Sequence, residues 1–98
     1  MPIVYIRPST RATKRLLAEF PNRVVHFGSR DGSTYIDHYG PDIRDAWLAR
    51  HKVRERDYQS AGALARWLLW EETTLREAIK SLNLQQRTWK FRYQRKKQ

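Results

Sequence analysis

SAGALARWLLW, residues 60–70, is the most apolar stretch of an otherwise polar chain. Its two indoles, Trp67 and Trp70, are three residues apart and therefore share one face of a helix. Leu64 and Leu68 follow the same helical spacing and widen that face into a stripe that must be buried. Aromatic stripes with this spacing usually form cores rather than sites. The sequence therefore predicts a central helix against which the rest of the chain packs.

Two further helices are predicted on either side of the central one. Pro41, after Gly40, suits a first helical position, and the apolar spacing that follows predicts an amphipathic helix from Asp42 to Arg54. Ser60 is the expected N-cap of the central helix. Thr74-Leu75-Arg76-Glu77 matches a capping box, so a third helix should begin there.

The first forty residues predict a small antiparallel sheet. Residues 3–6 are β-branched and aromatic, which favours a short strand. Residues 14–28 favour a hairpin whose turn is Pro21-Asn22, although a helix over residues 12–19 is the open alternative. Residues 34–36 are a further candidate strand. The predicted class is α+β: an N-terminal sheet, three short helices and a basic aromatic C-terminal tail.

Length and composition limit the protein class. A chain of 98 residues has room for one domain, which we expect over residues 1–85, followed by a tail over residues 86–98. The absence of cysteine excludes a disulfide framework and thiolate metal sites. No stretch predicts a signal peptide or a membrane span, so the expectation is a soluble intracellular protein or a component of an assembly.

The excess positive charge lies at the two ends of the chain. Twenty basic and ten acidic side chains give a net charge of +10. Residues 1–40 carry +3, residues 41–85 carry +1 and residues 86–98 carry +6. Such an imbalance destabilises a compact state unless a polyanion, an acidic protein or an anionic membrane relieves it.

Aromatic and cationic residues alternate in the predicted tail. Trp89, Phe91 and Tyr93 would lie on one side of an extended strand, and Lys90 and Arg92 on the other. Rings that stack on bases beside cations that contact phosphates suit single-stranded nucleic acid. The same pattern suits insertion into an acidic protein groove, and a solvated basic tail is the plain structural alternative.

The sequence contains no recognisable catalytic or metal-binding motif. His26, His38 and His51 are far apart and do not make a recognisable ligand set, so no metal or other cofactor is expected. Arg50 and Arg54 could hold a phosphate, but salt bridges to nearby acidic residues are the simpler interpretation. A phosphodiester-cleaving site built around His51 is a distant alternative.

The order of the motifs resembles a family of small basic uncharacterised proteins of large nucleocytoplasmic DNA viruses. The resemblance spans about residues 10–82 and is carried by residues 25–28, 35–38, 49–55, 60–70 and 74–79. It implies a viral origin and supports the hairpin over residues 14–28. It assigns no catalytic residue, and the aromatic tail lies outside it.

These observations predict a non-enzymatic, virion-associated protein that binds nucleic acid, with DNA expected, and helps to package or organise viral DNA. The alternative is a minor capsid or scaffold protein whose aromatic C-terminal strand anchors to a neighbouring subunit. Expected partners are nucleic acid, other virion proteins or both, without a membrane. The expected locations are the virion and the host cell cytoplasm or nucleus. The predicted nucleic-acid-binding residues are Arg7, Arg11, Lys14, Arg15, Arg87, Trp89, Lys90, Phe91, Arg92, Tyr93, Arg95, Lys96 and Lys97.

Overall fold

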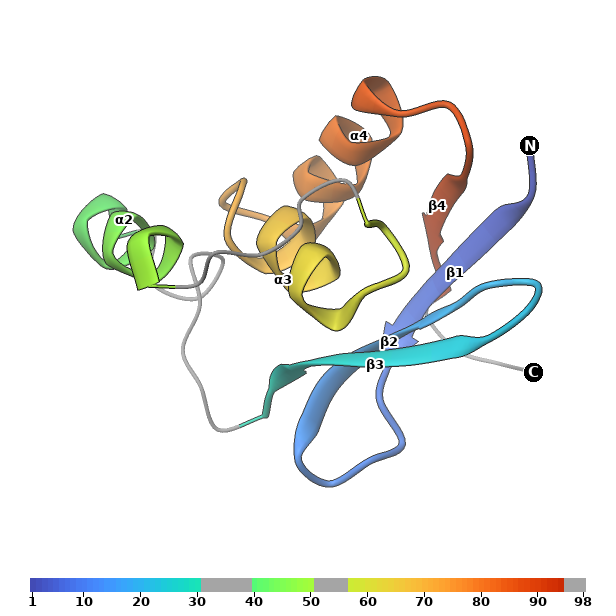
Figure 1. Ribbon diagram of the computed structural model, residues 1–98, viewed down its shortest axis with the longest axis horizontal. Coiled ribbons are helices and arrows are strands. Elements are labelled where there is room, and N and C mark those ends of the chain that lie inside the picture. The colour runs from blue at the N-terminus through green and yellow to red at the C-terminus, as the bar shows by residue number, and fades with distance from the viewer. Residues whose placement is uncertain (31–39, 51–56, 95–98) are drawn as a thin grey trace.

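The computed structural model describes residues 1–30, 40–50 and 57–94. In these residues one sheet packs against helices, which makes the fold α+β, as predicted (Figure 1). The elements in chain order are β1 (Ile3–Pro8), β2 (Lys14–Glu19), β3 (Val24–Ser29), α2 (Pro41–Arg50), α3 (Ala61–Leu69), α4 (Leu75–Gln85) and β4 (Lys90–Tyr93).

The four strands form one mixed sheet in the order β3-β2-β1-β4. β2 and β3 pair antiparallel across the turn at Pro21-Asn22, which confirms the predicted hairpin and excludes the alternative helix over residues 12–19. β1 pairs antiparallel with β2 but parallel with β4. The antiparallel sheet predicted for the first forty residues is therefore confirmed for β1, β2 and β3. β4, which was predicted to belong to the tail, adds a parallel strand to this sheet. The candidate strand at residues 34–36 lies outside the described residues.

The helices begin where the sequence predicts. Ser60 Oγ accepts a hydrogen bond from the Ala63 amide at 3.1 Å, and Thr74 Oγ1 accepts one from the Glu77 amide at 3.1 Å. Each bond satisfies one of the free amides in a first helical turn. α2 begins at Pro41, and the predicted continuation of this helix beyond Arg50 lies outside the described residues.

The core lies between the sheet and the two helices α3 and α4, which cover the same face (Figure 1). Val4 and Ile6 of β1 are fully buried there, together with Leu64 and Leu68 of α3. The stripe predicted for residues 60–70 is thus confirmed as core. Trp70 is also buried, whereas Trp67 is only partly buried against the cluster.

Within the described residues, α2 contacts the domain through Trp47 and Arg44. The rings of Trp47 and Trp70 stack at 4.9 Å. Arg44 donates from Nε to the Trp70 carbonyl at 2.6 Å and from Nη2 to Glu71 Oε1 at 2.9 Å. No residue of α2 is itself buried. The helix therefore lies beside the core and adds little to it.

The C-terminal aromatic segment is part of the domain rather than a free tail. The Lys90 amide donates to the Pro2 carbonyl at 3.0 Å, and the Gln94 amide donates to the Ile6 carbonyl at 2.8 Å. Phe91 is 2 % exposed and lies in the core. The predicted domain boundary at residue 85 is therefore wrong: the domain continues to at least residue 94, and residues 95–98 lie outside the described residues.

Two side chains hold β4 in place. The Asn83 side chain of α4 accepts from the Phe91 amide at 2.8 Å and donates to the Phe91 carbonyl at 2.9 Å. The Gln86 side chain accepts from the Thr88 and Trp89 amides and donates to the Trp89 carbonyl. These bonds satisfy backbone groups at a sheet edge and in the connection leading to it.

Candidate nucleic-acid interface

The sheet has a second face, turned away from α3 and α4, which we call the outer face. Strand pairing identifies its residues, because side chains opposite one another in the register point to the same side. Tyr5 alternates with the buried Val4 and Ile6, and its register partners are Glu19 on β2 and Arg92 on β4. By the same register the outer face comprises Ile3, Tyr5, Arg7, Leu17, Glu19, Val24, His26, Lys90 and Arg92.

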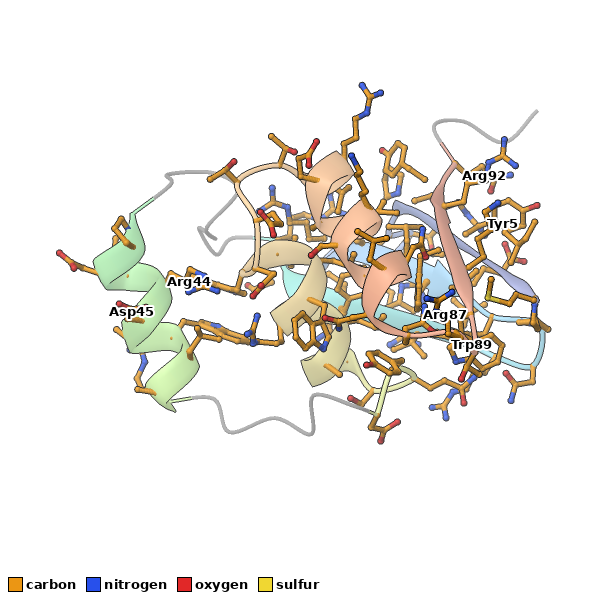
Figure 2. All side chains as sticks on the ribbon, turned by 90° about the horizontal axis from the view of Figure 1, so that it is seen from above. Tyr5, Arg44, Asp45, Arg87, Trp89 and Arg92 are labelled. Atoms are coloured by element: carbon orange, nitrogen blue, oxygen red, sulfur yellow. The ribbon has the colours of Figure 1, made fainter. Side chains whose placement is uncertain are left out.

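The outer face brings cations from both ends of the chain together. Arg7 lies on β1, while Lys90 and Arg92 lie on β4, more than eighty positions later in the sequence. Figure 2 shows Tyr5 and Arg92 side by side, as expected from their pairing in the strand register. The parallel pairing of β1 with β4 thus joins two charge clusters that the sequence keeps apart.

The cations of the outer face differ in how they are held. Arg7 forms a salt bridge with Glu19 and donates to Gln94 Oε1 at 3.5 Å. Lys90 and Arg92 are exposed and make no ion pair with any residue in the described ranges 1–30, 40–50 and 57–94. Their charges are available to an anion, whereas the Arg7 charge is partly neutralised.

A second group of cations lies at the β1–β2 connection, around His26. Ser9 Oγ lies 2.7 Å from His26 Nδ1 and accepts a hydrogen bond from the Arg11 amide at 3.0 Å. Burial lowers the pKa of His26 below its usual 6.5, and the charges of Arg11 and Lys14 lower it further. His26 is therefore neutral at pH 7, and the positive charge at this end of the outer face comes from the arginine and the lysine.

The predicted basic residues have mixed positions in the structure. Arg7, Lys90 and Arg92 lie on the outer face, and the charges of Arg11 and Lys14 are close enough to His26 to lower its pKa. Arg15 is half-buried on β2 with interactions inside the domain, and Arg87 is exposed in the connection before β4. Arg95, Lys96 and Lys97 lie outside the described residues.

The predicted base-stacking rings need correction. Rings and cations do alternate along β4, but the rings face the core and the cations face outward. Phe91 is buried and meets Phe20 edge-on at 6.1 Å, so it cannot stack on a base. Trp89 is partly buried and meets Phe20 edge-on at 5.1 Å. Tyr93 is 39 % exposed, on the helix side of β4.

The positions of these three rings also bear on the alternative function, a capsid or scaffold protein anchored through its C-terminal strand. A strand that inserts into a neighbouring subunit needs backbone and rings that are free to leave the domain. Here β4 pairs with β1 of the same chain, and its central ring fills the core. The segment chosen for that role thus has an internal partner.

Sequence reasoning missed Tyr5 as a candidate contact. It was assigned only to a strand, although its alternation with Val4 and Ile6 is the signal that it belongs to the opposite face. It is a half-buried ring on a central strand, next to the exposed Arg92. An aromatic side chain beside exposed cations can stack on a base while the cations contact phosphates.

Other kinds of site find no support in the described part of the chain. Within residues 1–30, 40–50 and 57–94, no three His, Cys, Asp or Glu side chains are grouped so that they could hold a metal ion. None of the helices described there is long and apolar enough to cross a bilayer.

Comparison with known proteins gives one result. Residues 4–51 match the model of a family of unknown function (DUF5754). Searches of curated proteins and of solved structures found no match. The matched stretch includes Tyr5 and Arg7 but ends before the helices α3 and α4 and before β4, so the family model covers only part of the outer face.

Proposed function

We propose that this protein binds nucleic acid through the outer face of its sheet, mainly by contacts to phosphates. The observation that carries the proposal is the β1–β4 pairing, which gathers Arg7, Lys90 and Arg92 on one face beside Tyr5. Exposed cations without acidic partners leave a positive field that a polyanion relieves. The net charge of +10 for the whole chain supports the same class of partner.

Single-stranded nucleic acid suits this face better than a duplex does. Four-stranded sheets whose aromatic side chains stack on unpaired bases are a known solution to single-strand recognition, and we use them here as an analogy. Tyr5 is the ring available on the outer face within the described residues. Bases in a duplex are stacked on one another, so a duplex would offer this face only its phosphates.

The binding experiment measures the affinity for a fluorescent single-stranded 12-mer of thymidines by anisotropy across a salt series. Replacing Lys90 and Arg92 with alanine removes two phosphate contacts. We expect weaker binding and a slope of log affinity against log salt that is less steep by about 1.4. The matched control replaces Arg50 and Lys80, two exposed cations on helices, and should leave the slope nearly unchanged. Equal affinities and equal salt slopes for the two double variants would refute the outer face as the binding site.

The contribution of the ring is measured separately. Tyr5→Ala removes the stacking surface, which is worth about 1 to 3 kcal/mol per base in such sites. Tyr5→Phe keeps that surface and should bind nearly as well as the original chain. Equal losses in both variants would assign the effect to the hydroxyl group rather than to stacking.

For the biological role, we propose a virion-associated, non-enzymatic protein that helps to organise packaged DNA. The resemblance to small basic proteins of large DNA viruses supports this role, and the exposed cations of the outer face supply a physical means for it, because they can contact the phosphates of single-stranded or double-stranded DNA. Mass spectrometry of purified particles is the test. Absence of the protein from particles that contain the genome would reject the role without affecting the binding proposal.

A further inference from the structure

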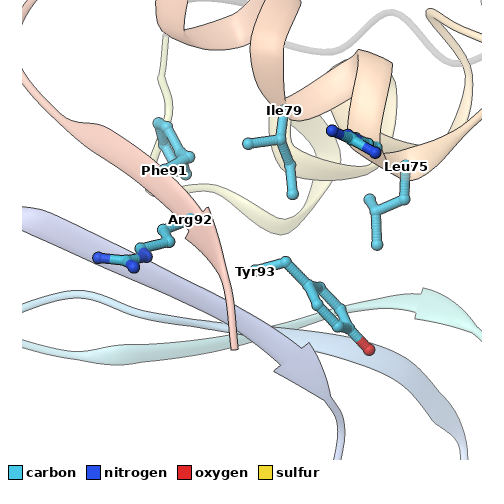
Figure 3. Close-up of a pocket in the computed structure, with 6 residues that line it drawn as sticks. Leu75, Ile79, Phe91, Arg92 and Tyr93 are labelled. Atoms are coloured by element: carbon cyan, nitrogen blue, oxygen red, sulfur yellow. The ribbon is translucent and has the colours of Figure 1, made fainter. Parts of the chain in front are cut away.

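A groove of about 530 Å³ opens between α4 and the end of β4. Figure 3 shows its walls, with Leu75 and Ile79 of α4 facing Tyr93 of β4. The lining is mainly apolar, with two arginines among its residues: Leu75, Arg76, Ile79, Phe91, Arg92 and Tyr93.

The groove arises from the way α4 and β4 meet. Asn83 holds the two elements together at Phe91 through its two backbone hydrogen bonds. Among the lining residues, Ile79 and Phe91 are buried, while Tyr93 is 39 % exposed. A large ring with that exposure offers a flat apolar surface to a ligand.

The positive charge in the groove restricts the ligand. Arg76 and Arg92 are both exposed and form no ion pair with the residues that the structure describes. An anionic ligand gains a charge-assisted hydrogen bond from an exposed arginine, which an uncharged apolar ligand does not. A ligand with a flat aromatic part and an anionic part can contact the Tyr93 ring and Arg76 together. Nucleotides have this combination, and the groove volume is within the range of small-ligand sites.

Arg92 connects the groove to the outer face. It lines the groove and is also the register partner of Tyr5. Figure 3 shows the Arg92 and Tyr93 side chains leaving β4 in different directions, as alternation along a strand requires. β4 is an edge strand of the sheet, so a nucleic acid chain on the outer face can pass around this edge into the groove.

We propose that the groove receives one unstacked base of a single-stranded nucleic acid, with its phosphate held by Arg76, while Arg92 holds a neighbouring phosphate on the outer-face side of β4. This inference rests on the proposed function and narrows its substrate to strands with unpaired bases. Double-stranded DNA does not present a free base, so it gains nothing from the groove.

The experiment compares Tyr93→Ala and Arg76→Ala with Lys80→Ala, which removes an exposed cation from the same helix. The probes are the single-stranded thymidine 12-mer and a 12-bp duplex. Tyr93→Ala should weaken single-strand binding by at least about fivefold and leave duplex binding within twofold. Arg76→Ala should weaken single-strand binding more than Lys80→Ala does.

Direct occupancy is measured by NMR during titration with adenosine 5′-monophosphate. Shifts of the Leu75 and Ile79 methyl signals support the groove, whereas shifts confined to Tyr5 overturn it. Unchanged single-strand affinity in the Tyr93 and Arg76 variants would also refute the proposal that the groove receives a base. In that case the proposed function still stands if replacing Lys90 and Arg92 weakens binding. If the original chain binds neither oligonucleotide at low salt, the proposed function itself fails.

Discussion

Replacing Phe91 with alanine is the sharpest test of the position of the C-terminal segment. The ring is 2 % exposed, in the core between β4 and the helices, and contacts Phe20 edge-on. A Phe→Ala change at such a position costs about 3 to 5 kcal/mol, since it removes buried surface and leaves a cavity. If residue 91 instead lay in a solvated tail, the same change would alter stability by less than about 0.5 kcal/mol.

The expected loss is large compared with the total stability. A domain of this length has a free energy of unfolding of about 5 to 15 kcal/mol. A loss of at least 3 kcal/mol should lower the melting temperature by about 12 °C or more. The Asn83 bonds to the Phe91 backbone are retained in the variant, so the measured change reports the ring.

Urea denaturation followed by tryptophan fluorescence gives the free energy of unfolding, and Trp89 next to the site makes the signal sensitive there. Lys90→Ala and Arg92→Ala are controls on the same strand, because both side chains are exposed. They should stay within about 0.5 kcal/mol of the original chain. Phe91→Leu, which keeps most of the apolar volume, should lose less than the alanine variant. If the Phe91→Ala variant unfolded at the same urea concentration as the controls, the buried position of Phe91 on β4 would be refuted.

Three further changes test other parts of the structure. Asn83→Leu leaves the Phe91 amide and carbonyl without their partner and should cost about 1 to 3 kcal/mol in urea denaturation, with Asn83→Asp recovering part of the loss because it keeps the acceptor. Gly28→Ala should cost about 1 to 3 kcal/mol, since Gly28 has φ +78° and an added Cβ would lie 2.8 Å from Leu69 Cδ1; a variant as stable as the original would contradict that geometry. Because the pKa of His26 is lowered below 6.5, the unfolded chain binds more protons as the pH falls below 6.5, so the free energy of unfolding should decrease there. The free energy of unfolding of the His26→Gln variant should decrease less between pH 7.5 and 5.5. The same pH dependence in the variant and the original chain would argue against the lowered pKa of His26.

The proposed interface also links stability to binding. Positive charges gathered on one face repel one another in the free protein, and an anion bound to the folded state stabilises it by mass action. The cations concerned lie at the two ends of the sequence, whereas residues 41–85 are nearly neutral. If the proposed interface binds an anion, the bound state should therefore be more stable to unfolding, including at the β1–β4 pairing, which is the longest-range pairing in the sheet.

The candidate site was only partly predictable from sequence. Arg7, Lys90 and Arg92 were named as contacts because of their charge, and the structure places them on one face. Tyr5 was missed, and Phe91 was predicted to contact nucleic acid although its side of the strand faces the core. Alternation with period two shows which residues share a face of a strand. Which of the two faces is buried depends on what packs against it in the folded protein.

The sequence by itself determined the elements whose signals are local. Helix starts at Ser60 and Thr74 and the hairpin turn at Pro21 depend on residues within a few positions of each other, so short-range hydrogen bonding and backbone preferences suffice to predict them. Only the tertiary structure decided that residues 90–93 pair with β1, parallel and across almost the whole chain. That pairing depends on burying Phe91 beneath α4, and a burial gain of this kind exists only once the distant elements are assembled.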